Sequence, residues 1–220
     1  MTTPNPHDDR YAGDEYYWGK APSAMCDRVL SAMRPEPGQS LKLLDLGCGE
    51  GRNAVYFAQQ GFEVFALDSS LPGLRKLERY AAEVGVSIHT IHADLLTYRL
   101  EDTLDVVFST GVLHYLPPEV REERFADYKA HTAPGGLHAM SVFVRKPFIP
   151  PAPDGESTAH SYRSGELLGY YCDWEIAYCT EEVFDCMSSG VPHRHAVNRI
   201  LARPAPAGIG ATERGLADAP

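Results

Sequence analysis

The stretch LLDLGCGEGRN covers residues 43–53 and decides the fold: an apolar run ends at Asp45 and Leu46, glycines follow at 47, 49 and 51, and a helical pattern begins at once. Glycine permits a tight turn and lets the backbone approach a ligand where a Cβ would collide. This order of strand, glycine turn and helix predicts a nucleoside-type ligand. The dinucleotide pattern G-x-G-x-x-G/A fits poorly, because counting from Gly47 puts Arg52 in its third position.

Strand and helix patterns alternate outward from this turn. Helical spacing ends at glycine or proline each time, and the apolar runs are short, as buried strands are. Such βαβ repetition predicts an α/β, doubly wound, mostly parallel seven-stranded sheet with helices on both faces. We expect strands at 41–46, 63–67, 87–92, 104–109 and 137–144, and helices at 52–60, 71–84 and 118–132.

The two ends of the chain depart from this alternation. Residues 1–40 are predicted to form an N-terminal entry segment and a helix that begins at Pro22, with the first fifteen residues frayed unless the substrate site orders them. The main domain is expected over 41–203, and a Pro/Gly/Ala-rich tail over 204–220. The proline-rich loop 145–163 is longer than a compact fold requires, which is typical of a lid or of an insertion without a role. A short helix at 164–171 and a C-terminal antiparallel hairpin, with strands at 174–186 and 196–202, should complete the domain.

Composition narrows the function classes. With 20 basic and 30 acidic residues among 220, the formal net charge is −10, which opposes binding to a phosphate backbone. We therefore expect no nucleic-acid partner. No run of about 18 apolar residues and no leader pattern is found in the sequence, so we expect no membrane partner and a cytoplasmic location.

The five cysteines include no C-x-x-C pair, so reduced thiols are expected and no metal site is predicted. Cys172, Cys179 and Cys186 recur every seven residues, which on a helix would suggest a soft-metal or oxyanion site. Their surroundings are aromatic and β-branched and favour a strand, on which an offset of seven alternates faces. His193, Arg194 and His195 follow, and on a strand the two histidines would share one face.

Acidic residues end the first three predicted strands. Asp45 precedes the glycines, where a carboxylate would oppose a pyrophosphate but attract an ammonium group. Asp68 ends the second strand, where a carboxylate in α/β nucleotide sites accepts hydrogen bonds from ribose hydroxyls. Asp94 and Leu95 follow the third strand and are placed to contact an adenine ring. Together these positions are more specific than the glycine loop alone.

The motifs DLGCGEG, ALD with Asp68, HADL and DVVFSTGVLHYL resemble those of class I S-adenosylmethionine-dependent methyltransferases, over about residues 41–144. YYWGK, FSTGVLHYL, APGG and SYRSGELLGYYCDWEIAYCTEE are similar to the tellurite-resistance (TehB-like) methyltransferases. The resemblance implies S-adenosyl-L-methionine as cofactor. The residues it assigns to the cofactor are Asp45, Gly47, Cys48, Gly49, Asn53, Asp68, Ser69, Asp94, Leu95, Ser109 and Thr110.

Residues for the methyl acceptor are predicted around the same crevice. Tyr17 and Trp18 would close over the site or clamp the N-terminal helix. Arg145 and Arg163 flank the long loop and could hold an oxyanion, although solvated surface charge is the alternative. His114 follows the fourth strand and is the candidate general base, packing being its other role.

The function implied is methyl transfer to a small molecule, with a tellurite- or selenite-type oxyanion as the first acceptor class. The alternatives are an amine, hydroxyl or thiol metabolite, or a protein that binds the cofactor as a regulatory signal without turnover. An NAD-dependent oxidoreductase is disfavoured by the glycine spacing. We expect a monomer or a homodimer with a small-molecule acceptor as partner.

Overall fold

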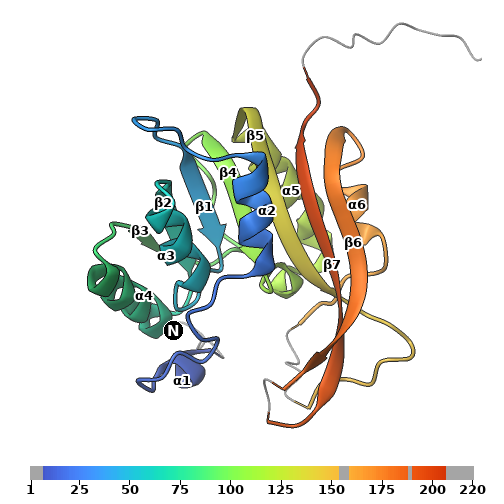
Figure 1. The fold of residues 1–220 in the computed structure, drawn as a ribbon. Helices are drawn as coiled ribbons and strands as arrows, with labels where there is room; N and C mark the ends of the chain where they lie inside the picture. Colours follow the sequence, from blue (N-terminus) through green and yellow to red (C-terminus); the bar gives the residue numbers. More distant parts are fainter. Residues whose placement is uncertain (1–6, 154–158, 188–189, 207–220) are drawn as a thin grey trace, which may run out of the picture.

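The computed structural model describes residues 7–153, 159–187 and 190–206. Seven strands form one sheet in the order β3-β2-β1-β4-β5-β7-β6 (Figure 1). The first five are parallel, whereas β7 is antiparallel to both β5 and β6. The predicted doubly wound α/β sheet with a C-terminal antiparallel hairpin is confirmed. The strands are β1 (Lys42–Leu46), β2 (Glu63–Asp68), β3 (His89–His92), β4 (Leu104–Thr110), β5 (Thr132–Val144), β6 (Trp174–Cys186) and β7 (His193–Pro204).

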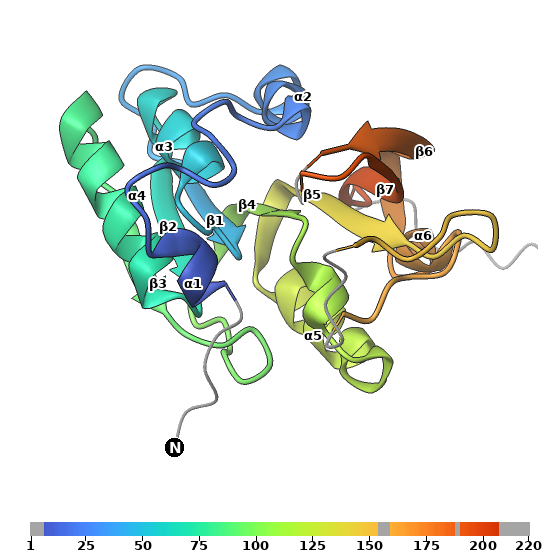
Figure 2. The same cartoon turned by 90° about the horizontal axis from the view of Figure 1, so that it is seen from below.

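Helices cover both faces of the sheet, as Figure 2 shows from below. On one face lie α2 (Ala24–Ala32), α3 (Arg52–Gln59) and α4 (Leu71–Val84), and on the other lie α5 (Pro118–Ala130) and the short α6 (Glu166–Gly169). A 3-10 turn, η1 (Leu113–Tyr115), follows β4, and α1 (Asp8–Tyr11) packs against α4.

The strands are apolar on both faces because each face has its own core. Leu43 packs with the α2–α4 layer and Leu44 with the α5 layer, and Val106 and Val107 on β4 divide in the same way. All four side chains are at most 1% exposed. This explains why the central runs are hydrophobic without alternation.

The N-terminal segment departs from the sequence expectation. Residues 8–20 do not fray within the described part of the chain, because α1 and the stretch after it pack on the glycine loop and on α4. The predicted N-terminal helix, α2, starts at Ala24 instead of Pro22, since Ser23 caps it by accepting a hydrogen bond from the Met25 amide. The expected tail is outside the described residues from 207 onward.

Two strands begin earlier than predicted. β5 begins at Thr132 instead of Leu137, because its pairing with β4 jumps from Leu104↔Thr132 to Val106↔Leu137 and Gly135 and Gly136 absorb the bulge. A Cβ at Gly136 would lie 2.8 Å from the Asp105 carbonyl oxygen. β7 begins at His193 instead of residue 196, because the polar trio at its start pairs with the end of β6.

The connection from β3 to β4, residues 93–103, contains no helix. β6 is the outermost strand on the other side of the sheet, and most of its residues are exposed or half-buried. In the described part of the chain, no helix has the length and apolar character needed to cross a membrane.

Replacement of Gly51 tests the glycine turn. Gly51 has a φ of +89°, and a Cβ there would lie 2.4 Å from Cγ of Leu77 on α4. We expect Gly51→Ala to lower the free energy of unfolding by about 2–5 kcal/mol, since a strained backbone and an overpacked core both contribute. Gly85→Ala is the matched control: its φ is +75° but nothing lies within 4 Å, so about 1–2 kcal/mol of backbone strain is expected. Equal losses in urea unfolding would contradict the packing argument.

Candidate cofactor and acceptor site

The glycine loop is fixed by backbone hydrogen bonds. The amides of Gly47 and Cys48 both donate to the Leu67 carbonyl, at 2.8 and 3.0 Å, which ties the end of β1 to the end of β2. Gly47 and Gly49 have φ values of +71° and +55°, in the left-handed region. A Cβ at Gly47 would lie 2.5 Å from the Val112 side chain after β4, so only glycine fits.

Asp68 lies beside this loop, as the sequence predicts. Its Oδ2 accepts a hydrogen bond from the Gly49 amide at 2.8 Å, and its Oδ1 accepts one from the Ser70 amide at 2.7 Å. Burial raises the pKa of Asp68 above its usual range, against the lowering effect of these two amides. A carboxylate has about four acceptor sites, so both oxygens can still accept from ribose hydroxyls.

Asp45 is buried at the end of β1, with 1% of its surface exposed. Its Oδ2 has no hydrogen-bond partner among the described residues, although the group is fully enclosed. Burial, and then the negative charge of Asp68, raise the pKa of Asp45 to about 7. A buried acceptor without a donor is costly, and an ammonium group would supply both a donor and a compensating charge. This unsatisfied oxygen fits the amino-acid end of S-adenosylmethionine.

The residues after β3 are placed at the same edge of the sheet. Asp94 is exposed, and its Oδ1 accepts a hydrogen bond from the Leu96 amide at 2.8 Å, which fixes the turn. Leu95 is half-buried and packs against the core on the α5 side. Ser69 is exposed, and its carbonyl contacts the His92 ring nitrogen at 3.1 Å.

Four other predicted cofactor residues are engaged within the protein. Asn53 receives the Ser23 amide on its Oδ1 at 2.9 Å and donates to Thr110 Oγ1 at 3.2 Å, which joins α3 to α2 and β4. Ser109 is fully buried and donates to the Leu46 carbonyl. Cys48 is buried, and burial raises the pKa of its thiol far above the ordinary value. These contacts support the glycine loop from the protein interior.

An ion pair that the sequence did not predict fixes the N-terminal segment on the glycine loop. Lys76 Nζ lies 2.7 Å from Glu50 Oε1, and both side chains are less than 10% exposed. Glu50 also accepts a hydrogen bond from the Trp18 amide, and Lys76 donates to the Glu15 carbonyl. Nothing in the sequence indicates that the acid inside the glycine motif contacts a lysine 26 positions later.

Aromatic residues of the N-terminal segment lie over the same loop. The Tyr11 hydroxyl would lie 3.0 Å from a Cβ at Gly49, and it accepts a hydrogen bond from the Trp18 indole. Trp18 and Tyr17 are 40% and 37% exposed and meet edge to face, with ring centroids 4.8 Å apart. His7 Nε2 lies 3.1 Å from the Tyr115 hydroxyl, so the segment reaches from the glycine loop to the turn after β4.

His114, the predicted base, lies in η1 after β4 and is 5% exposed. Burial, with nearby His7 and His195, lowers its pKa to about 3. Its Nδ1 has no hydrogen-bond partner among the described residues, and its ring lies 4.9 Å from that of Phe143. The imidazole is therefore neutral and weakly basic at pH 7.

The long loop has a firmly held end. Tyr162 pairs with the end of β5, and the His160 amide donates to the His114 carbonyl at 2.6 Å. The buried Arg121 guanidinium donates to the His160 carbonyl and to Glu166. Arg145 and Arg163, predicted to hold the acceptor, are both exposed. Part of the expected lid, 154–158, is outside the described residues.

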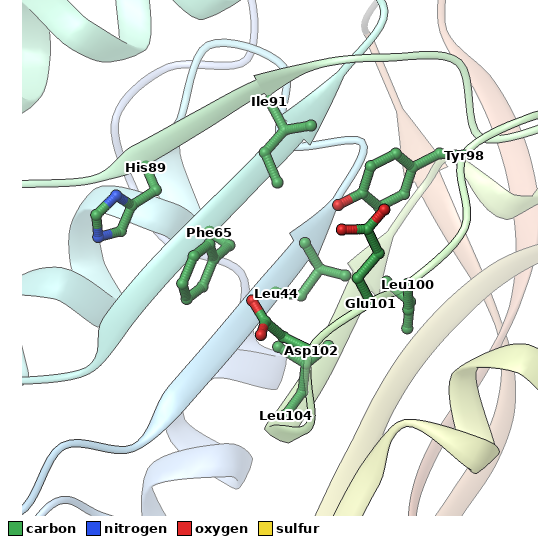
Figure 3. A pocket seen from close by; sticks show the side chains of 9 residues that line it. All are labelled: Leu44, Phe65, His89, Ile91, Tyr98, Leu100, Glu101, Asp102 and Leu104. Carbon is green, nitrogen blue, oxygen red and sulfur yellow. The ribbon is translucent and has the colours of Figure 1, made fainter.

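Figure 3 shows a pocket of about 250 Å³ lined by mid-strand side chains that include Leu44, Phe65 and Ile91. It lies where the β3–β4 connection has no helix. It contains none of the carboxylates at the strand ends, so it is separate from the cofactor residues.

The chain is similar to known proteins in both sequence and fold. The family model described as "Tellurite resistance protein TehB" matches residues 10–197. The probable S-adenosyl-L-methionine-dependent methyltransferase TehB of Haemophilus influenzae is 28% identical over 143 residues, which cover 64% of this chain and 49% of that protein. The chain spans about half the length of the curated relatives that match it first.

Two further matches cover a larger share of the similar protein's own length. A 2-heptyl-1-hydroxyquinolin-4(1H)-one methyltransferase of Mycobacteroides abscessus is 29% identical over 173 residues, 73% of this chain and 74% of that protein. The crystal structure of TehB from Haemophilus influenzae superposes with a TM-score of 0.73 at 23% identity, covering 90% of this chain and 66% of that one. The similarity to this crystal structure confirms the fold.

The pKa of Asp45 predicts a pH dependence of cofactor binding. Below about pH 7 the carboxyl holds a proton that an ammonium-bearing ligand must displace, so affinity for S-adenosylhomocysteine should rise as pH increases through 7. The rise should be at most about tenfold per pH unit below that value, with proton release on binding. The folding stability of the ligand-free protein should change in the opposite direction. Ionising a buried carboxyl is unfavourable, so the free energy of unfolding should fall as pH rises through 7.

Calorimetry in buffers of different ionisation enthalpy measures both the affinity and the proton release. Asp45→Asn should bind more weakly and lose the pH dependence, whereas the exposed Asp102→Asn should behave as the unaltered protein. An affinity that stays constant through pH 7 would show that Asp45 does not face the ligand's charge.

Proposed function

The chain belongs to the TehB family of S-adenosylmethionine-dependent methyltransferases, and from this premise we propose that it transfers a methyl group to a small, soft nucleophile of the tellurite or selenite type. The observation that carries the cofactor half of this proposal is the unpartnered, buried Oδ2 of Asp45 beside a glycine loop of left-handed backbone. The match to the TehB family model supports the choice of a tellurite- or selenite-type acceptor.

Each end of the cofactor has a group of this chain to hold it. Asp45 would receive the ammonium, and Asp68 the two ribose hydroxyls. Asp94 and Leu95 would contact the adenine ring from the next strand end. All of them lie where the carboxyl ends of parallel strands meet, which is the edge where open α/β sheets bind ligands.

The bound cofactor supplies an electrophilic methyl group on a sulfonium. A lone pair of the acceptor would form the new bond to the methyl carbon as the carbon–sulfur bond breaks, leaving S-adenosylhomocysteine with an uncharged thioether sulfur. Holding the two reactants in line can supply about 7–11 kcal/mol of the barrier reduction. A chalcogen lone pair carries no proton, so no general base is required. The weakly basic His114 is compatible with such an acceptor.

Water exclusion is the contribution we assign to the N-terminal segment. The Glu50–Lys76 pair holds that segment against the loop, with Tyr11 and Trp18 above Gly49. A site shielded from water strengthens the electrostatic attraction between the protein and the sulfonium cofactor. Arg145 and Arg163 are the cations we assign to an anionic acceptor, although both are exposed.

A hydroxyl acceptor on a small heterocycle is the second candidate. It is favoured by the relative named for a hydroxyquinolone, which matches about three quarters of each chain. Such an acceptor needs a proton acceptor near neutral pH. A regulator that binds the cofactor without turnover is the remaining alternative.

Turnover with methyl-labelled S-adenosylmethionine tests the proposal. The acceptor panel holds tellurite, selenite, 1-hydroxyquinolone, thiols and small amines, and volatile and soluble products are counted separately. We expect soluble methylated product from the chalcogen oxyanions, and volatile labelled product only when a thiol reductant is supplied together with them. Asp68→Ala, which removes the ribose carboxylate, should bind S-adenosylhomocysteine at least about tenfold more weakly and lose turnover in proportion.

Label found only in the hydroxyquinolone would replace the first acceptor class with the second. Tight binding of S-adenosylhomocysteine without transfer to any acceptor would favour the regulator.

A separate prediction concerns His114. With a pKa of about 3, its ionisation falls far below neutral pH, so the rate of chalcogen methylation should show no His114-dependent step between about pH 6 and 8. We expect His114→Gln to keep the shape of the wild-type pH–rate profile and most of the rate. Loss of a titration step near pH 7 in this variant would instead identify His114 as a base.

A further inference from the structure

The hairpin of β6 and β7 brings together three potential metal ligands that the cofactor site does not use. Cys186 ends β6 and is paired with His193 at the start of β7, and Phe184 is paired with His195. One ligand atom each from Cys186, His193 and His195 lies within 4.8 Å of the other two, and all three residues are half-buried.

The register of the hairpin explains this proximity. Residues two apart on a strand share a face, so His193 and His195 point the same way, as the sequence predicts. Their Nε2 atoms are 2.9 Å apart. The last pair between β5 and β7 is Val144↔Ala196, so the cluster lies just past the end of β5, on the edge that carries the glycine loop (Figure 1).

The protonation pattern of His193 is set by the backbone. Its Nδ1 lies 2.7 Å from the Val191 carbonyl oxygen, which can only accept, so Nδ1 carries the proton in the neutral ring. The lone pair is therefore on Nε2, aimed at His195. Metal-binding histidines are typically oriented by a backbone carbonyl or carboxylate in this way.

His195 is held by aromatic rings. Its ring stacks on Phe143 with centroids 4.7 Å apart and lies 5.7 Å from Phe184. Packing on two sides limits the rotamers of the imidazole before any ligand arrives. A preformed ligand loses less entropy on binding.

We propose that Cys186, His193 and His195 form a site for a borderline-soft divalent cation, with Zn²⁺ as the reference ion. One thiolate and two imidazoles suit zinc and disfavour Mg²⁺ and Ca²⁺, which prefer oxygen ligands. Bonds of about 2.0–2.3 Å in a tetrahedral site place ligand atoms about 3.3–3.8 Å apart, so small rotamer changes suffice. Binding converts the Cys186 thiol to a thiolate with loss of one proton to solvent, and the Nε2 proton of His195 moves to Nδ1.

Three protein ligands leave a fourth position open. A surface pocket of about 490 Å³ adjoins the cluster and is lined by Cys186 and His193, with Arg194 at its rim. Zinc sites with three protein ligands and an open position accept water or an anion there. The open position would therefore take water or a small anion from this pocket.

The seven-residue repeat of cysteines is not the basis of this site. Cys172 lies in the turn before β6, and Cys179 lies within β6 near Asn198, whose side-chain amide approaches its sulfur at 3.7 Å. Only the last cysteine of the repeat meets histidines. The cysteine spacing predicted no metal site, because the histidine partners of Cys186 come from the facing strand.

Titration of the metal-free protein with Co²⁺ and Zn²⁺ tests the proposal. We expect one Co²⁺ per chain with a thiolate-to-cobalt charge-transfer band, displaced by one equivalent of Zn²⁺ and untouched by excess Mg²⁺. Cys186→Ser should abolish the band, and His195→Ala should weaken Zn²⁺ binding at least about tenfold. Cys179→Ser, an exposed thiol on the same strand, is the matched control and should keep both.

Binding of S-adenosylhomocysteine checks that each variant is folded, and it needs no metal. The metal proposal is independent of the acceptor assignment, because its readouts require neither cofactor turnover nor acceptor. A band that survives in Cys186→Ser, or Zn²⁺ affinity unchanged in both His193→Gln and His195→Ala, would overturn it.

Discussion

Two backbone amides share the carboxylate of Asp68, and the geometry of the carboxyl edge depends on that arrangement. Gly49 comes from the loop after β1 and Ser70 from the cap of α4, so a single side chain fixes the turn and the helix start relative to each other. Charge-assisted hydrogen bonds to backbone donors are stronger than neutral ones. The same oxygens are the ribose acceptors that we propose, so the group that builds the loop is also the group assigned to the ligand.

A buried ion pair extends this arrangement to the N-terminal segment. Burying Glu50 and Lys76 costs desolvation energy, and their 2.7 Å contact together with hydrogen bonds to Trp18 and Glu15 offsets it. Removing one partner of such a pair leaves an uncompensated charge, at a cost of about 3–5 kcal/mol. The pair therefore fixes the position of residues 15–18 relative to the glycine loop.

The parallel core could be predicted from sequence because its signals are local. Apolar runs, capping residues and glycines placed α4 at its observed bounds and put Asp45, Asp68 and Asp94 at strand ends. The start of β5 could not be read, because Gly135 and Gly136 signal a stop, whereas here they let the chain bulge past Asp105 and resume pairing.

Features that depend on long-range packing could not be predicted from the sequence either. The position of His114 after β4 is local, but its low pKa depends first on burial by distant parts of the chain and then on the nearby His7 and His195. Asn53 and Glu50 each have one partner before β1, Ser23 and Trp18, and another far along the chain, Thr110 and Lys76. Whether such polar side chains face a ligand or another part of the chain is decided by tertiary contacts, which no spacing rule contains.

The outer strand of the sheet has a consequence for solubility. β6 is 13 residues long and borders the sheet, so its free backbone edge could template pairing with another chain. Its exposed residues include the acids Glu175 and Asp185, and also Glu181 and Glu182, which form ion pairs with Lys146 and Arg199. Edge-to-edge addition of a second copy would bring acids toward acids in a protein whose formal charge is already −10. Charge thus guards the open border of the sheet against ribbon-like aggregation, a task that other β proteins give to proline or to a covering helix.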